Sequence, residues 1–141
     1  MPDSIKIKVR GYHLDIYGHV NNARYLEFLE EARWAFFEHH NTLEVFKEFK
    51  LAFVLVNINI NYRRPGFPDD VLHITTNVES IGNKSCKIHQ QILLEGSNEV
   101  IADAMITFVL MEMKTNKAVI IDGEVRKKLM QMVDTKTEPC G

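Results

Sequence analysis

The side chains with the most chemical capacity lie within one stretch, 12-YHLDIYGHVNNARYLEFLEEARW-34. His13, Asp15 and His19 fall within seven residues of one another, and Asn21 and Asn22 follow them. Imidazole and carboxylate groups exchange protons near neutral pH, and both are common ligands of zinc and iron. The stretch is therefore compatible with a metal site, with an acid/base site beside a helix, or with a turn and a helix cap.

The spacing gives little support to a metal site. Strand alternation would place His13 and Asp15 on the same side, but His19 lies beyond Gly18, where a turn is expected. The two histidines lack the four-residue spacing of a helical metal-binding pair. The two cysteines, Cys86 and Cys140, are too far apart to form a zinc knuckle. We therefore expect no bound metal.

The acid/base interpretation depends on the helix that follows. We expect one long amphipathic helix from about Asn22 to His40, with Asn21 or Asn22 as its N-cap. The free N–H groups of its first turn could polarise a carbonyl, and Asp15 would stand just ahead of them as a base or nucleophile. The same residues also fit a turn closed by Asp15 and capped by asparagine, and spacing alone does not separate the two. The helix pattern places apolar side chains on one face and charged ones on the opposite arc; the apolar set is Tyr25, Leu26, Leu29, Ala32, Phe36 and Phe37, and the charged set is Glu27, Glu30, Glu31 and Arg33.

The rest of the chain predicts an α+β fold with an antiparallel sheet. Asn41 and Glu44 resemble a capping pair ahead of a short second helix. Segment 51–63 alternates strictly, which puts Val54, Val56, Ile58 and Ile60 on one face and residues 53, 55, 57, 59 and 61 on the other. Because one helix cannot cover both faces of such a sheet, we expect a dimer or a larger assembly. Strands are expected at 5–9, 51–63, 71–80, 84–94, 99–112 and 117–121, with short turns between the later ones and a last helix at 124–133.

Length and composition indicate a single globular domain. The 141 residues are 45% hydrophobic and 26% charged, and we expect one domain over residues 1–133 with a flexible tail at 134–141. A net charge of −2 argues against nucleic-acid binding. The longest apolar run, at 51–56, is too short to cross a membrane, and the first residues lack the core of a secretory signal, so we expect a cytoplasmic protein. The glycines are scattered singly and form no phosphate-binding loop, and we expect no cofactor.

The stretch D-I-Y-G-H-V-N-N-A-R-Y-L-E-F-L-E-E-A-R resembles the signature of hotdog-fold acyl-CoA thioesterases of the 4-hydroxybenzoyl-CoA thioesterase type. The segments 51-LAFVLVNININYRRP-65 and 102-ADAMITFVLMEMKT-115 extend the resemblance, within that family, to the bacterial long-chain enzymes associated with fatty-acid β-oxidation. The resemblance covers about residues 5–133. It implies a long helix wrapped by a curved antiparallel sheet, assembly into homodimers or homotetramers, and hydrolysis of medium- to long-chain acyl-CoA to free fatty acid and CoA.

Carried over residue by residue, the resemblance assigns the catalytic carboxylate to Asp15 and the amide donor at the helix start to Asn22 or a neighbour. It leaves open whether the carboxylate is a nucleophile or a general base. Gly18 would let the loop turn sharply beneath the substrate. His19 and Tyr25 are close enough to orient water or substrate, although either could simply pack.

Coenzyme A carries phosphates, so cations are expected near the mouth of the pocket. Arg63, Arg64, Lys84 and Lys87 stand at strand ends beside turns and are the candidates, although the same positions suit residues that only solubilise the rim of the sheet. Some proteins of this fold use a glutamate on the long helix, which makes Glu30 and Glu31 reserve candidates for the carboxylate.

Two alternatives to the thioesterase remain at this point. A hotdog hydratase or dehydratase would need a histidine for proton abstraction, which would give His13 or His19 the role of Asp15. A non-catalytic module that binds acyl-CoA or an acyl carrier protein would use Asp15 only to hold the turn.

Overall fold

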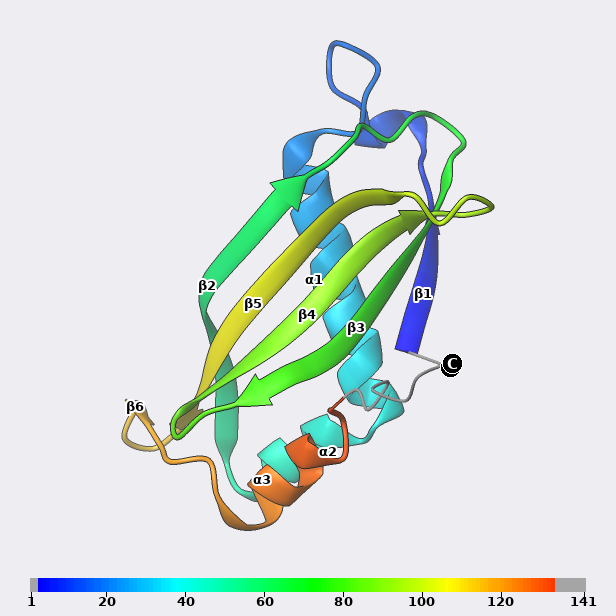
Figure 1. Ribbon diagram of the computed structural model, residues 1–141. Coiled ribbons are helices and arrows are strands. Elements are labelled where there is room, and N and C mark those ends of the chain that lie inside the picture. Colours follow the sequence, from blue (N-terminus) through cyan, green and yellow to red (C-terminus); the bar gives the residue numbers. More distant parts are fainter. Residues whose placement is uncertain (1–2, 134–141) are drawn as a thin grey trace.

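The fold is a curved antiparallel sheet wrapped around one long helix, as the computed structural model shows for residues 3–133 (Figure 1). The strands follow the order β1-β3-β4-β5-β2, and β6 pairs with the end of β5. This arrangement confirms the predicted α+β hotdog fold. The elements are β1 (Asp3–Lys8), a 3-10 turn η1 (Gly11–His13), α1 (Asn22–His39), α2 (Thr42–Glu48), β2 (Leu51–Tyr62), β3 (Val71–Ile81), β4 (Ser85–Leu94), β5 (Val100–Glu112), β6 (Lys117–Ala118) and α3 (Gly123–Met130).

Helix α1 forms because its apolar residues share one face that the concave side of the sheet buries. Phe36 and Phe37 are fully enclosed there with Phe108 of β5 and the isoleucines of the inner sheet rows. The prediction that Arg33 lies on the charged arc opposite the apolar face is wrong, because this residue is only 6% exposed. Its Nη1 donates to Oε1 of Gln90 at 3.1 Å, and Gln90 in turn donates to Leu29 O and Thr76 Oγ1, each at 3.0 Å. The buried side-chain amide of Gln90 on the sheet therefore holds the guanidinium group of Arg33 beneath the helix.

Strand β2 does not keep the strict alternation that its sequence predicts. The pairing of β2 with β5 shifts between Leu55 and Asn57, so that Val56 is the extra residue of a β-bulge and is 55% exposed. The side chains facing the helix are therefore Phe53 and Leu55 before the bulge and Ile58 and Ile60 after it. One extra residue in a strand moves every later side chain to the opposite face of the sheet. The face towards the helix therefore contains residues of one predicted row before the bulge and of the other row after it.

The smaller elements differ modestly from the predictions. Asn41 precedes α2, but its backbone is left-handed (φ 58°) and its side chain makes no cap hydrogen bond, so the predicted capping pair is wrong. The last strand is much shorter than predicted, and α3 ends at Met130 rather than at 133. The 3-10 turn η1 was not predicted, because a single turn of three residues has no periodic signal. The predicted tail at 134–141 lies outside the described residues.

Candidate active site

The carboxylate of Asp15 is held in a tight loop between Leu14 and Val20, which form an antiparallel bridge. The Asp15 N–H donates to His19 O at 2.8 Å, and the Gly18 N–H donates to Asp15 O at 3.1 Å, with Gly18 at φ +78°. One carboxylate oxygen, Oδ1, accepts from the N–H groups of Tyr17 (2.8 Å) and His19 (3.2 Å). Within residues 3–133, Oδ2 accepts no hydrogen bond. The loop thus fixes the orientation of the carboxylate and leaves one oxygen for a ligand.

Asn21 is the N-cap of α1, and it is one of the two residues predicted for that position. Its Oδ1 accepts from the Ala23 N–H at 2.8 Å, and its carbonyl accepts from the Arg24 N–H at 2.9 Å. Among the described residues, the Asn22 N–H has no acceptor. This N–H also lies at the positive end of the helix dipole, at the position where the family resemblance predicts the amide donor.

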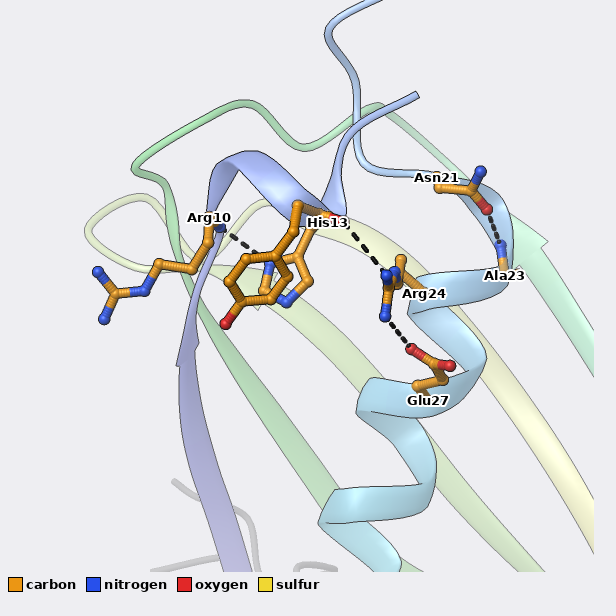
Figure 2. A network of polar contacts seen from close by, with 7 residues as sticks. Arg10, His13, Asn21, Ala23, Arg24 and Glu27 are labelled. Atoms are coloured by element: carbon orange, nitrogen blue, oxygen red, sulfur yellow. Dashed lines mark hydrogen bonds and ion pairs between the residues drawn. The ribbon is translucent and has the colours of Figure 1, made fainter. Parts of the chain in front are cut away.

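Two hydrogen bonds tie the segment before the loop to the helix start, and a third lies within that segment. The Asn21 N–H donates to His13 O at 2.8 Å. Nη2 of Arg24 donates to Tyr12 O at 3.2 Å (Figure 2). The third contact fixes the turn itself, because the Arg10 N–H donates to Nδ1 of His13 at 2.9 Å. The ring of His13 is buried against Phe28, and this burial, with Arg24 and Arg10 nearby, lowers its pKa below 6.5 although Glu27 opposes the shift. His13 therefore positions the segment rather than facing a ligand.

A cavity of about 410 Å³ joins the loop, the helix start and the end of β2. Six of the nine predicted site residues line it: Asp15, His19, Asn22, Tyr25, Arg63 and Arg64. The seventh, Gly18, lies in the loop behind Asp15 and provides its left-handed turn. A carboxylate and an unpaired helix N–H thus meet in one cavity, which is what acyl transfer by attack on a polarised carbonyl requires.

Tyr25 and His19 contribute differently to the cavity wall. Tyr25 is buried, and its hydroxyl oxygen accepts from the Gly66 N–H at 2.9 Å, which leaves its own hydrogen to donate. Burial raises the pKa of Tyr25, so the phenol stays protonated at neutral pH. A Cβ at Gly66 would lie 3.1 Å from Cγ2 of Val20 and 3.4 Å from the Tyr25 hydroxyl oxygen, so a larger residue there would have to displace these side chains by a few tenths of an ångström. The ring of His19 packs edge to face on Phe67, with centroids 5.2 Å apart.

The chain matches the family model of the thioesterase-like superfamily over residues 9–129. It is 55% identical to the long-chain acyl-CoA thioesterase FadM of Escherichia coli (strain K12) over 128 residues, which are 91% of this chain and 97% of that protein. The chain belongs to the thioesterase-like superfamily. Its structure is similar to that of the probable thioesterase YbaW from Escherichia coli, with a TM-score of 0.88, 53% identity, and coverage of 93% of this chain and 98% of that one. The fold alone is shared with a 1,4-dihydroxy-2-naphthoyl-CoA thioesterase from Synechocystis, with a TM-score of 0.80 at 15% identity over 94% of this chain and 98% of that one.

The two arginines in the cavity of this thioesterase-like chain are already ion-paired. Nε of Arg63 lies 2.8 Å from Oδ2 of Asp103, and Arg64 pairs with Glu99. The hydrogen bond from Arg63 lowers the pKa of Asp103. Because both pairs are solvent-exposed, they cost little to open, and either cation can exchange its carboxylate for a phosphate.

The remaining candidates lie elsewhere. Lys84 is in the turn between β3 and β4, whose Gly82 and Asn83 carbonyls accept from Arg126 and Ile121, near α3. In Figure 1 this turn is at the end of the sheet opposite the Asp15 loop. Lys87 is exposed on the convex face of β4. The structure therefore brings neither lysine to the cavity of the same chain.

The reserve glutamates and the metal interpretation receive no support from the geometry. Glu30 and Glu31 are exposed on α1, about 12 Å or more beyond Asn22 at 1.5 Å per residue. Over residues 3–133, no group of three or more histidine, cysteine, aspartate or glutamate side chains converges as metal ligands would. Within the same residues, no helix is both long and apolar enough to span a membrane.

Tyr62 is a polar cavity residue that the sequence did not reveal. Its hydroxyl donates to Asn22 O at 3.2 Å, and its ring lies 5.6 Å from that of Tyr25. The only available signal was its place as the last residue of a strand that ends near Pro65. Because pairing of β2 with β5 brings this strand end beside the helix start, the contact depends on the tertiary fold.

Proposed function

We propose that this protein hydrolyses medium- to long-chain acyl-CoA thioesters to free fatty acid and CoA in the cytoplasm. Asp15 acts as nucleophile or general base, and the Asn22 N–H polarises the thioester carbonyl. The observation that carries the proposal is the shared cavity, which holds a carboxylate with one unoccupied oxygen beside an unpaired helix N–H. An oxyanion donor of this kind contributes about 3 kcal/mol to stabilising a transition state.

Both roles of Asp15 give the same balanced reaction. As a nucleophile, Oδ2 attacks the carbonyl carbon, the C–S bond breaks to release CoA thiolate, and water then hydrolyses the acyl anhydride. As a general base, Asp15 accepts a proton from a water molecule that attacks the carbonyl directly, and the proton passes to the departing sulfur. One water is consumed in each route, and no oxidant or cofactor takes part.

The neighbouring side chains orient the reactants. The Tyr25 hydroxyl has a hydrogen left to donate to the carbonyl or to water, since its oxygen accepts from Gly66. The His19 ring lies in the same cavity wall and can hold a water against Asp15. Arg63 and Arg64 are the basic residues that can receive the CoA phosphates at the mouth, by exchange with Asp103 and Glu99.

The working unit of this proposal is a homodimer or a homotetramer. Strand β2 pairs only with β5 among the described strands, so its other edge has free N–H and C=O groups. Because β2 also ends at the cavity, a second copy paired along this edge would stand beside the active site. Light scattering at several concentrations measures the assembly directly.

The decisive experiment is an assay of thiol release from octanoyl-, tetradecanoyl- and hexadecanoyl-CoA. Wild-type protein should release thiol, and Asp15→Asn and Asp15→Ala should release it at least about a hundredfold more slowly. Asp122→Asn is the matched control, because Asp122 is an exposed loop carboxylate whose side chain makes no cap hydrogen bond. Full activity of Asp15→Asn would refute its role.

The same assay separates the two alternative functions. Binding of acyl-CoA by the wild type without thiol release would favour the non-catalytic module. Hydration of an enoyl-CoA double bond, abolished by a change at His19, would favour the hydratase. His13 is not a candidate base in this geometry, since its Nδ1 accepts from the Arg10 N–H and the residue does not line the cavity.

A further inference from the structure

Tyr62, the last residue of β2, lies against the first turn of α1. Its hydroxyl donates to Asn22 O at 3.2 Å, and its ring lies 5.6 Å from that of Tyr25, with the two planes inclined by 50°. No other hydrogen bond within residues 3–133 joins β2 to the first turn of α1. A carbonyl oxygen has two lone pairs, so Asn22 O can accept from the tyrosine as well as within the helix. Tyr62 therefore links the strand end to the residue that supplies the helix N–H of the proposed site.

The strand end that carries Tyr62 is itself fixed by β5. The Arg63 N–H donates to Ile101 O at 2.8 Å. On the convex face, the side chains of Asn61 and Arg63 both donate to the carboxylate of Asp103, at 3.1 Å and 2.8 Å. Because side chains alternate along a strand, Tyr62 points to the opposite face, towards α1. Its hydroxyl thus reaches the helix from an anchored backbone.

From these contacts we infer that Tyr62 is a positioning residue, which holds Asn22 so that its N–H meets the thioester carbonyl. The inference rests on the proposed function, in which this N–H polarises that carbonyl. The N–H and the C=O of Asn22 flank one Cα, so a hydrogen bond that fixes the C=O also fixes the N–H. An oxyanion donor acts over a narrow range of distance, and a misplacement of about 1 Å can cost roughly a hundredfold in rate. Tyr62 thus raises kcat without touching the reacting atoms.

The first test removes only the hydroxyl. Tyr62→Phe keeps the ring against Tyr25, and kcat for tetradecanoyl-CoA should fall about fivefold, which is the worth of one hydrogen bond. KM should not change, because the lost interaction acts on the transition state. Tyr12→Phe is the matched control, since Tyr12 is 71% exposed near the same helix start and its hydroxyl makes no hydrogen bond within residues 3–133. An unchanged kcat in Tyr62→Phe, or an equal fall in Tyr12→Phe, would contradict the inference.

The second test asks whether the hydroxyl acts through the Asn22 N–H. Asn22→Pro deletes this N–H at the first position of the helix, where proline is well tolerated, and Asn21 before it already has the extended backbone that proline requires (φ −62°, ψ 136°). We expect kcat to fall about a hundredfold. Adding Tyr62→Phe to Asn22→Pro should then cause no further fall. A further fivefold fall would overturn the inference, because it would show that Tyr62 acts by another route.

These variants separate failure of the inference from failure of the proposed function. Full kcat in Asn22→Pro would refute the amide donor itself. A low kcat in Asn22→Pro together with a wild-type kcat in Tyr62→Phe would refute only the role of Tyr62. Tyr62 also lines the cavity and is half-exposed, so a rise in KM without a fall in kcat would identify it as a substrate contact and would overturn the positioning role. Thermal unfolding followed by circular dichroism shows whether each variant is folded.

Discussion

The two ends of α1 are held by different kinds of contact. At the N-terminal end, the Asp15 loop and the Asn21 cap are held by hydrogen bonds between residues close in sequence. Towards the C-terminal end, Trp34 packs against Phe53 of β2, and the two line a mostly apolar cavity together with side chains of α2 and of the segment after β5. The comparison indicates that short-range polar contacts fix the Asp15 loop and the start of the helix, whereas long-range apolar packing forms the other end.

The largest expected effect concerns the N-terminal end. Asp15→Asn keeps an oxygen that can accept from Tyr17 and His19, so the loop should stay folded while the base is lost. We expect kcat to fall by a factor of about 10² to 10⁴. The fall should be equal for octanoyl- and tetradecanoyl-CoA. A loss confined to one of the two substrates would contradict this prediction.

The next largest effect is expected for the buried hydrogen bonds of Gln90, which lie beneath α1 between its two ends. Gln90→Leu removes the acceptor of Arg33 and the donor to Leu29 O and Thr76, and Nε of Arg33 already lacks a partner among the described residues. A buried cation left without its acceptor costs about 3 kcal/mol in free energy of unfolding, which urea denaturation measures. We expect the ratio of activities on long and short chains to remain unchanged.

The control for that change is Gln91→Leu, on the opposite face of the same strand. Gln91 pairs across to Asp103 on the convex side, and a substitution there should alter the free energy of unfolding by no more than about 0.5 kcal/mol. Equal destabilisation by both variants would mean that the polar contacts beneath α1 do not stabilise the fold.

The same contrast explains what the sequence could predict. The long helix, its cap and the main strands follow from local periodicity and turn residues, and Asp15 was placed correctly ahead of the helix start. The assignment of Asp15 as the catalytic candidate needed the family resemblance, since a capped turn has the same spacing. The burial of Arg33 was missed because its partner Gln90 is 57 residues away. The bulge at Val56 was missed because it appears only in the pairing of β2 with β5.

A smaller effect is expected at the cap. Asn21→Ala removes the acceptor of the Ala23 N–H and should lower the free energy of unfolding by about 1 kcal/mol, whereas Asn21→Ser should retain most of it. Because the cap fixes the start of α1 beside Asp15, activity on short and long chains should fall together. Thermal unfolding and the two-substrate assay measure both quantities. A change in the ratio of the two activities would argue against this role of the cap.

The smallest effect is a dependence of stability on pH from His13. Burial is the main cause that lowers its pKa, and the nearby cations Arg24 and Arg10 act in the same direction while Glu27 opposes them. Below pH 6.5 the folded state therefore binds fewer protons than the unfolded state. The contribution of His13 to the free energy of unfolding is complete above pH 6.5, and it is lost as the pH falls through the lowered pKa. His13→Gln keeps an acceptor for the Arg10 N–H but cannot titrate. Urea unfolding at pH 7.5 and 5.5 should show a smaller loss of stability on acidification for His13→Gln than for wild type. Equal losses would show that protonation of His13 is not linked to folding.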